Sequence, residues 1–242
     1  MKPSDPRPGR RVLRSSCGAC LLLAAFAALA FLTACASTRS PPPLQPVDAD
    51  YPGELRPASD FPADVLLRQR VSASWGDAAS GDPRAHGQRS FDCAFQKQGD
   101  TLTLLGLSPL GSVTFVVKLV GDRVEFENRT PEPLPFPPRF ILLDVERVFF
   151  PWLATGGAPL VDGVHESVLG DERVTERWSA GQLVERRFER IDGHPAGAIR
   201  ITFGGDREGR FAPPSALLDN GWLNYRLSVE TYEQAPLPTA VP

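Results

Sequence analysis

Apolar and polar residues alternate with a period of two along much of this 242-residue chain. One instance is Phe91, Cys93 and Phe95, which are separated by Asp92 and Ala94. Because successive side chains of a β-strand point to opposite faces, this pattern predicts strands with one buried face. Strands are expected within residues 91–96, 101–104, 113–119, 124–127, 173–190, 198–203 and 223–232. With a hairpin over 173–190, at least eight strands are expected in one sheet system.

The segment Arg173–Arg190 predicts a long hairpin with a defined register. Its facing pairs are expected to be Arg173 with Glu189, Glu176 with Arg186, Arg177 with Glu185, Val174 with Phe188, and Trp178 with Val184. One face is then polar and solvated, while the other carries the aromatic residues. The Arg and Glu side chains of this segment are therefore interpreted as a solvent-exposed face of the sheet rather than as catalytic groups.

Arg139–Leu153 is the segment with a convincing helical period. Its apolar stripe consists of Ile141, Val145, Val148 and Trp152, widened by Leu142, Phe149 and Leu153. Pro151 would cost a helix interior about 3 kcal/mol, so the helix is expected to end or bend near Phe149. A second, short helix is expected around Ser59–Arg70, capped by Ser59 or Asp60. The whole pattern predicts a mainly β fold: a strongly curved antiparallel sheet or incomplete β-barrel, with one or two helices as a lid.

The N-terminus has the pattern of a bacterial lipoprotein signal. A basic segment and the uncharged apolar run Cys17–Leu32 precede Leu32-Thr33-Ala34-Cys35. A transmembrane anchor is the alternative, but a bilayer core needs about 20 apolar residues, more than this run offers. Residues 1–34 are therefore expected to be removed and Cys35 to carry acyl chains. The domains are expected to be 1–34 signal peptide, 35–57 lipidated Cys and Pro-rich tether, 58–234 β domain, and 235–242 disordered tail.

The residues after Cys35 indicate where such a lipoprotein would be sorted. Ala36 and Ser37 lack the Asp that commonly retains a lipoprotein at the inner membrane, so the periplasmic face of the outer membrane is expected in a Gram-negative host. A Gram-positive source stays open. Arg10-Arg11 also leaves open whether export uses the general or the twin-arginine route.

Composition argues against several function classes. Without residues 1–34, the chain keeps 21 Lys and Arg against 28 Asp and Glu, an acidic balance that argues against nucleic acid as a partner. Cys93 is then the one cysteine besides the lipidated Cys35, so no internal disulfide is expected. His86, His165 and His194 lack metal-ligand spacing, and no nucleophile motif is present. We expect neither an enzyme nor a metal site, and no cofactor other than the covalent lipid on Cys35.

Two short segments carry a resemblance to known lipoproteins. The run Leu102–Gly111, which ends in Pro109-Leu110-Gly111, resembles the Pro-Leu-Gly region of outer-membrane lipoprotein receptors of the LolB type, in the LolA/LolB-like group. Phe140–Val145 and Phe149-Phe150-Pro151-Trp152 look more like a LolB-related family of uncharacterised lipoproteins found with aryl polyene biosynthesis clusters. The resemblance covers about residues 65–232. It implies an incomplete β-barrel lidded by helices around a hydrophobic cavity for acyl chains, although the protruding apolar loop of a lipoprotein receptor has no obvious counterpart.

These observations predict a membrane-anchored lipoprotein that binds or carries a hydrophobic, lipid-like cargo, with a possible role in lipid or aryl polyene transport. The expected partners are membrane lipid through acylated Cys35, a ligand such as an acyl chain, glycolipid or polyene lipid, and a periplasmic carrier protein. Candidate cavity residues are Phe91, Phe95, Leu104, Val113, Phe115, Val117, Phe126, Val145, Phe149, Trp152, Trp178 and Trp222. Alternatively, these residues fill a solid core and the chain is a non-catalytic interaction or scaffold module of an envelope assembly. A lipid hydrolase is a weaker alternative.

Overall fold

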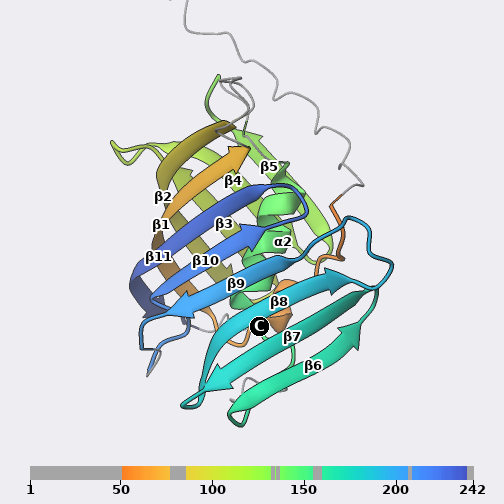
Figure 1. Cartoon of the computed structure of the whole chain (residues 1–242). Coiled ribbons are helices and arrows are strands. Elements are labelled where there is room, and N and C mark those ends of the chain that lie inside the picture. The colour runs from red at the N-terminus through yellow and green to blue at the C-terminus, as the bar shows by residue number, and fades with distance from the viewer. Residues whose placement is uncertain are drawn as a thin grey trace, which may run out of the picture. The chain divides into compact units, whose positions relative to one another are not determined.

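The computed structural model of the chain describes residues 51–76, 86–131, 134, 137–154, 160–206 and 209–238. The described residues form eleven strands, one α-helix and one short 3-10 helix (Figure 1). The first half contains η1 (Ala58–Asp60), β1 (Val65–Gly76), β2 (His86–Gln98), β3 (Thr101–Leu107), β4 (Val113–Val120), β5 (Arg123–Asn128) and α2 (Pro138–Phe149). The second half contains β6 (Gly163–Leu169), β7 (Glu172–Ser179), β8 (Gln182–Arg190), β9 (Ile199–Gly204), β10 (Ser215–Asn220) and β11 (Tyr225–Pro236).

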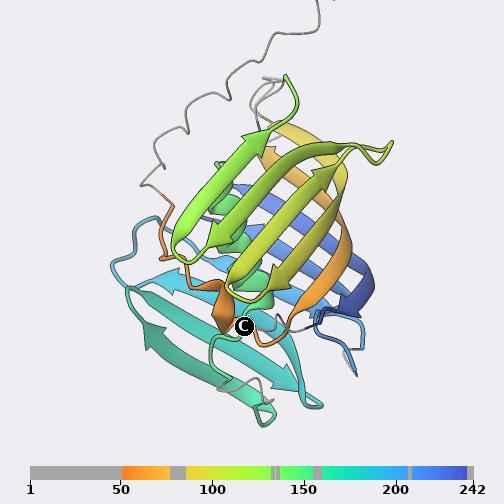
Figure 2. The ribbon, with the colours of Figure 1, turned by 180° about the vertical axis from the view of Figure 1, so that it is seen from behind.

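The eleven described strands belong to one antiparallel sheet in the order β5-β4-β3-β2-β1-β11-β10-β9-β8-β7-β6. Strands β1 to β5 follow one another as one meander, and β6 to β11 form a second (Figures 1 and 2). The first and last strands, β1 and β11, join the two meanders, with Val71 opposite Val229. The expected large antiparallel sheet is confirmed.

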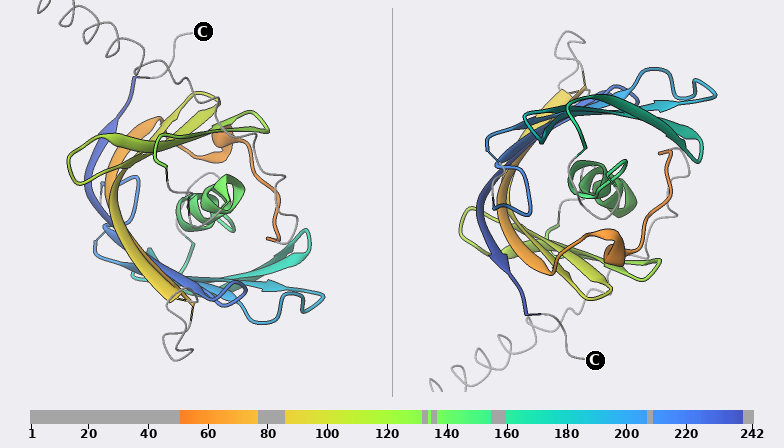
Figure 3. Two further views of the ribbon diagram at one scale, coloured as in Figure 1. Left: turned by 90° about the horizontal axis from the view of Figure 1, so that it is seen from above. Right: turned by 90° about the horizontal axis from the view of Figure 1, so that it is seen from below.

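The sheet curves around α2, which lies inside its concave side (Figure 3). The segment 51–60 runs along the open side, between the edge formed by β5 and the edge formed by β6 (Figure 3). The expected helix is confirmed, and it ends at Phe149, just before Pro151. The backbone N–H of Phe150 closes the last turn by donating to the carbonyl oxygen of Glu146 at 2.9 Å.

Two groups of buried apolar residues flank the helix. The first core cluster joins β1 to β5, η1 and one side of α2, with Leu67, Phe95 and Leu142 fully buried. The second core cluster joins α2 to β7 through β11, with Phe188 and Ile201 fully buried. Because α2 contributes to both, it is covered on two sides, and even its polar residues Asp144, Glu146 and Arg147 are buried.

The second expected helix, Ser59–Arg70, is wrong. Only Ala58–Asp60 forms a helical turn, and Val65–Gly76 is β1. Val65, Leu67 and Gln69 alternate with more exposed neighbours, which is the period of a strand. The alternation was hidden because Gln69 is polar yet points inward, where its Nε2 donates to Thr231 Oγ1 at 3.1 Å.

The expected register of the β7–β8 hairpin is confirmed from Arg173 to Arg177 and wrong at the turn end. A bulge after Arg177 pairs Trp178 with Leu183 rather than with Val184. The expectation of a wholly polar, solvated charge run is also wrong for Glu176 and Arg186, since both are buried.

The folded part of the chain extends beyond both expected boundaries of the β domain, residues 58 and 234. Tyr51 is 1% exposed, so Tyr51–Pro57 packs on the domain rather than belonging to a free tether. At the other end, β11 continues to Pro236, and Leu237 N donates to Asp64 O at 2.9 Å. Residues 1–50, with Cys35, and residues 239–242 lie outside the described residues.

Candidate functional site

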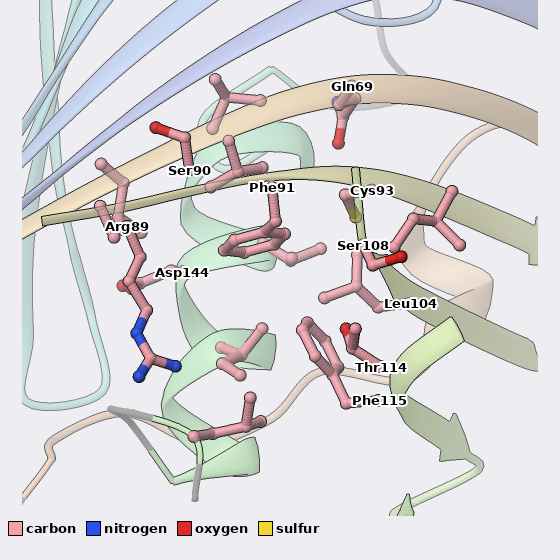
Figure 4. A pocket seen from close by; sticks show the side chains of 18 of the residues that line it. Gln69, Arg89, Ser90, Phe91, Cys93, Leu104, Ser108, Thr114, Phe115 and Asp144 are labelled. Carbon is pink, nitrogen blue, oxygen red and sulfur yellow. The ribbon is translucent and has the colours of Figure 1, made fainter. Parts of the chain in front are cut away.

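A cavity of about 480 Å3 lies between α2 and the inner face of the sheet (Figure 4). This volume is in the range of small-molecule sites, about 300–1,000 Å3. The strands that line it are β1, β2, β3, β4 and β11. Its walls consist of Gln69, Val71, Ala73, Arg89, Ser90, Phe91, Cys93, Leu104, Leu107, Ser108, Pro109, Thr114, Phe115, Thr130, Pro131, Leu134, Ile141, Asp144, Val145, Val148, Phe149, Leu227 and Val229.

The sheet wall follows from the alternation read in the sequence. On β2, Phe91 and Cys93 point inward, and Phe115 on β4 packs edge-on against Phe91 with ring centroids 5.7 Å apart. Gly106 on β3 lies directly opposite Phe115. A Cβ at Gly106 would lie only 2.0 Å from a carbon of the Phe115 ring, so the missing side chain is what lets this ring lie flat against the strand.

The helix wall comes from one face of α2. Ile141, Val145 and Val148 recur three or four residues apart, so they share a face, and Phe149 extends it. Phe149 also packs against Phe95, with ring centroids 5.7 Å apart. Helix and sheet are therefore in direct contact at Phe149.

The cavity changes from buried and apolar to exposed and polar along its length. Cys93 and Leu104 are 1% and 5% exposed, whereas Arg89, Ser90 and Pro109 are exposed. Burial raises the pKa of the Cys93 thiol far above its ordinary value, which disfavours the reactive thiolate. The buried end thus presents mainly apolar surface and a thiol that is not activated, beside Gln69, whose amide N–H donates to Thr231 Oγ1.

Asp144 is the acid among the described lining residues, and both of its oxygens are already hydrogen-bonded. The hydroxyls of Tyr51 and Tyr225 donate to Oδ1 and Oδ2, each at 2.5 Å, and Asn220 Nδ2 donates to the Tyr51 hydroxyl at 2.8 Å. Burial raises the pKa of Asp144 to about 6, an effect opposed by the two tyrosine hydroxyls and by Arg147. This arrangement fits a structural link between α2, the segment at Tyr51 and the β10–β11 hairpin.

Two further buried ion pairs lie where α2 faces β7 and β8. Arg147 contacts Glu172 at 3.0 Å, and Arg186 contacts Glu176 at 2.7 Å. The Arg147 guanidinium also stacks over the rings of Tyr51 and Trp222 at 4.8 and 5.2 Å. These residues hold α2 to the second meander and do not line the cavity.

The structure brings together five of the twelve candidate cavity residues, namely Phe91, Leu104, Phe115, Val145 and Phe149. Phe95 and Val117 instead fill the first core cluster, with Phe126 packed against it. Trp222 belongs to the second core cluster, and Trp152 packs against it. Val113 and Trp178 also lie away from the cavity walls, and the indole N–H of Trp178 donates to Glu176 at 3.1 Å.

Sequence reasoning missed the contribution of β1 and β11 to the walls. Val71 and Ala73 follow the expected helix Ser59–Arg70 and were assigned to no element, and Leu227 and Val229 were interpreted as part of an ordinary strand face. The register places Val71 opposite both Phe91 and Val229, so the three side chains share one inner face. Only long-range pairing reveals this, since the chain separates β1 from β11 by almost its whole folded length.

Two kinds of feature are absent from the described residues. No group of three or more His, Cys, Asp or Glu side chains gathers there as a metal site would require. Within the same residues, no helix has the length and apolar character needed to cross a bilayer.

Residues 66–233, from β1 to β11, match the family described as "Protein of unknown function (DUF3261)". The chain belongs to the DUF3261 family. The DUF3261 match spans both meanders and α2, and it therefore includes every described element that lines the cavity. A search of curated protein sequences finds no match.

Solved structures provide distant likenesses to this DUF3261 chain. A LolA superfamily protein from Nitrosomonas europaea is 7% identical, with a TM-score of 0.40, over 76% of this chain and 93% of that one. A putative outer membrane lipoprotein-sorting protein domain from Vibrio parahaemolyticus is 8% identical, with a TM-score of 0.35, over 75% and 88%. Lipoprotein LppX from Mycobacterium tuberculosis is 11% identical, with a TM-score of 0.32, over 76% and 93%. These scores are too low to transfer a ligand or a role.

Proposed function

We propose that this chain is an envelope lipoprotein that binds a hydrophobic, lipid-like molecule between its sheet and its helix, and carries it without covalent chemistry. The observation that carries the proposal is the cavity of about 480 Å3 with apolar walls from five strands and α2. The space opens to solvent at the end where Arg89, Ser90 and Pro109 are exposed, so a ligand can enter between α2 and the sheet and bury its apolar part against their side chains.

Apolar burial supplies a sufficient driving force. At about 25 cal/mol for each Å2 of apolar surface removed from water, a ligand that hides a few hundred Å2 gains several kcal/mol. Micromolar binding, about −8 kcal/mol, is therefore expected and would permit both loading and release. Acyl chains, glycolipids and polyene lipids, including those of aryl polyene transport, are the cargo classes proposed.

A lipid anchor on Cys35 would hold the domain at the periplasmic face of the outer membrane, where a periplasmic carrier protein would donate or accept the cargo. The Leu32-Thr33-Ala34-Cys35 sequence supports it. Cys35→Ser should abolish labelling by a fatty-acid analogue and leave an uncleaved precursor. Persistent labelling would refute the anchor without bearing on the cavity.

Photo-crosslinking in membranes tests ligand binding on the whole chain. An alkyl probe that carries a diazirine near its chain end should attach to peptides of the cavity wall, within 86–98 and 138–149, as mapped by mass spectrometry. Ala73→Trp should reduce this attachment at least several-fold, because Ala73 is buried in the wall and the indole would occupy the cavity. Val71→Phe is a milder variant with the same expected direction. Ala94→Trp is the matched control, since Ala94 is absent from the cavity walls.

Attachment that avoids the wall peptides, or that Ala73→Trp and Val71→Phe leave unchanged, would overturn the carrier proposal. The interaction-module alternative would then gain support. One observation favours that alternative: Val164 and Val168 on the edge strand β6 are 66% and 54% exposed and available to a protein partner.

A further inference from the structure

Strand β2 carries three side chains of different character along the inner face of the cavity. Cys93, Phe91 and Arg89 are two residues apart, so all three point to the same side of the sheet, and all three line the cavity (Figure 4). Their partners on β1 are Gln69, Val71 and Ala73, which also line it. The cavity therefore has a direction, with Cys93 near its buried end and Arg89 at its exposed end.

Arg89 is the one cation among the described residues that line the cavity. Its guanidinium sits on the inner face of a strand whose other inward positions are apolar or buried, whereas a solvating arginine would ordinarily point outward.

Hydroxyl groups share the end of the sheet where Arg89 lies. Antiparallel order brings the start of β2, the end of β3, the start of β4 and the end of β5 to one end. Ser108, Thr114 and Thr130 follow or begin these strands, and each lines the cavity. The hydroxyls of Ser108 and Thr114 are neutral hydrogen-bonding groups at the same end as the Arg89 charge, whereas the Thr130 hydroxyl donates to Asn128 Oδ1 at 3.0 Å.

We infer that the ligand is an amphiphile with a single anionic head group, held at Arg89, and an alkyl chain that extends past Phe91 toward Cys93. This inference rests on the proposed function and specifies its ligand class. A strand rises about 3.3 Å per residue, so the distance along β2 from residue 89 to residue 93 is about 13 Å, the depth available to the chain. A guanidinium donates several hydrogen bonds in a planar fork that fits a carboxylate or phosphate, which makes it a selective anchor.

The test compares three photo-crosslinking probes on the full chain in membranes. The probes share one diazirine-bearing alkyl chain and differ in the head group: a phosphate, a carboxylate or a neutral alcohol. The measured quantity is the yield at the wall peptides for each anionic probe divided by the yield for the alcohol. Probe partition into the membrane is the same for every protein variant, so it cancels when variants are compared.

The parent chain should favour at least one anionic probe over the alcohol by about tenfold, as expected for a charge-assisted hydrogen bond. Arg89→Gln should reduce the ratio to near one, Arg89→Glu should reverse it, and Arg89→Lys should retain most of it. Arg123→Gln is the matched control, because Arg123 is a largely exposed arginine at the opposite end of the sheet. The more efficient of the two anions identifies the ligand as a fatty-acid or a phosphate-bearing amphiphile.

Equal yields for all three heads in the parent, or a ratio that Arg89→Gln leaves unchanged, would overturn the inference while leaving the carrier proposal intact. An absence of wall attachment with every head would instead overturn the carrier proposal itself. The two failures are therefore distinguishable in one experiment.

Discussion

At the level of single residues, the enclosed position of α2 forces carboxyl groups into surroundings that disfavour charge. Glu146 is 1% exposed, and its two oxygens accept hydrogen bonds from the backbone N–H of Arg56 at 3.1 Å each. Burial nevertheless raises the pKa of Glu146 to about 8 from an ordinary 4.5, against the lowering effects of Arg56, Arg147 and Arg139. Glu146 therefore links the segment 51–60 to the helix in a pH-dependent way.

This shift has a definite sign in stability. The folded state holds the Glu146 proton more tightly than the unfolded state does. The contribution of this carboxyl to the free energy of unfolding is therefore fully present below pH 4.5 and is lost as pH rises through about 8. Glu146→Gln should flatten the decline in the free energy of unfolding across this interval. Denaturant titrations of both proteins at several pH values measure the difference. Parallel curves for parent and variant would show that Glu146 does not hold a raised pKa.

Residue-level features of the site were only partly predictable from the sequence. Phe91 and Leu104 were predicted correctly, because each lies in a short segment of alternating apolar and polar residues, and this alternation assigns its side chain to the buried face of the sheet. Arg89 was not found, because an arginine at an inward position interrupts the alternation of apolar and polar residues and is therefore interpreted as a surface residue. Asp144 was missed for a similar reason, since the helical stripe excludes it while enclosure on two sides buries it. Hydrophobic periodicity identifies the apolar face of a strand or helix, but it does not identify polar groups that become buried through tertiary contacts.

At the level of elements, α2 stabilises the first core cluster through Leu142, which has no exposed surface. Leu142→Ala should lower the free energy of unfolding by about 2–5 kcal/mol, because it removes buried methyl groups and leaves a void. Leu110→Ala, at a 94% exposed position between β3 and β4, is the control and should change stability by about 0.5 kcal/mol or less. Chemical denaturation measures both. Similar effects of the two substitutions would contradict the placement of α2.

Elements were predictable where the local pattern was strong. The end of α2 followed from Pro151, and most of the β7–β8 register followed from charge pairing. β6 was not predicted, because its side chains are largely exposed on both faces and show no clean alternation. β10 was also missed, although buried and exposed residues alternate along it.

At the level of the whole molecule, α2 couples the two core clusters, so they should unfold together. All four tryptophans lie outside the first core cluster: Trp75, Trp152 and Trp222 contact the second cluster, and Trp178 is on β7. Phe95→Ala, in the first cluster, should cost about 3–5 kcal/mol. If unfolding is cooperative, tryptophan fluorescence and far-ultraviolet circular dichroism should shift to the same lower denaturant midpoint. A fluorescence midpoint that stays at the parent value would show that the halves unfold independently.

The pairing of β1 with β11 places the first and last strands of the described chain side by side in the middle of the sheet. A ribosome delivers β1 first and β11 last. One edge of β1, with its unpaired backbone groups and the apolar face of Val65 and Leu67, therefore stays uncovered while every intervening strand is made. During synthesis, the nascent chain is for this reason most open to mispairing with foreign strands, and to capture by holding chaperones, until its final strand emerges.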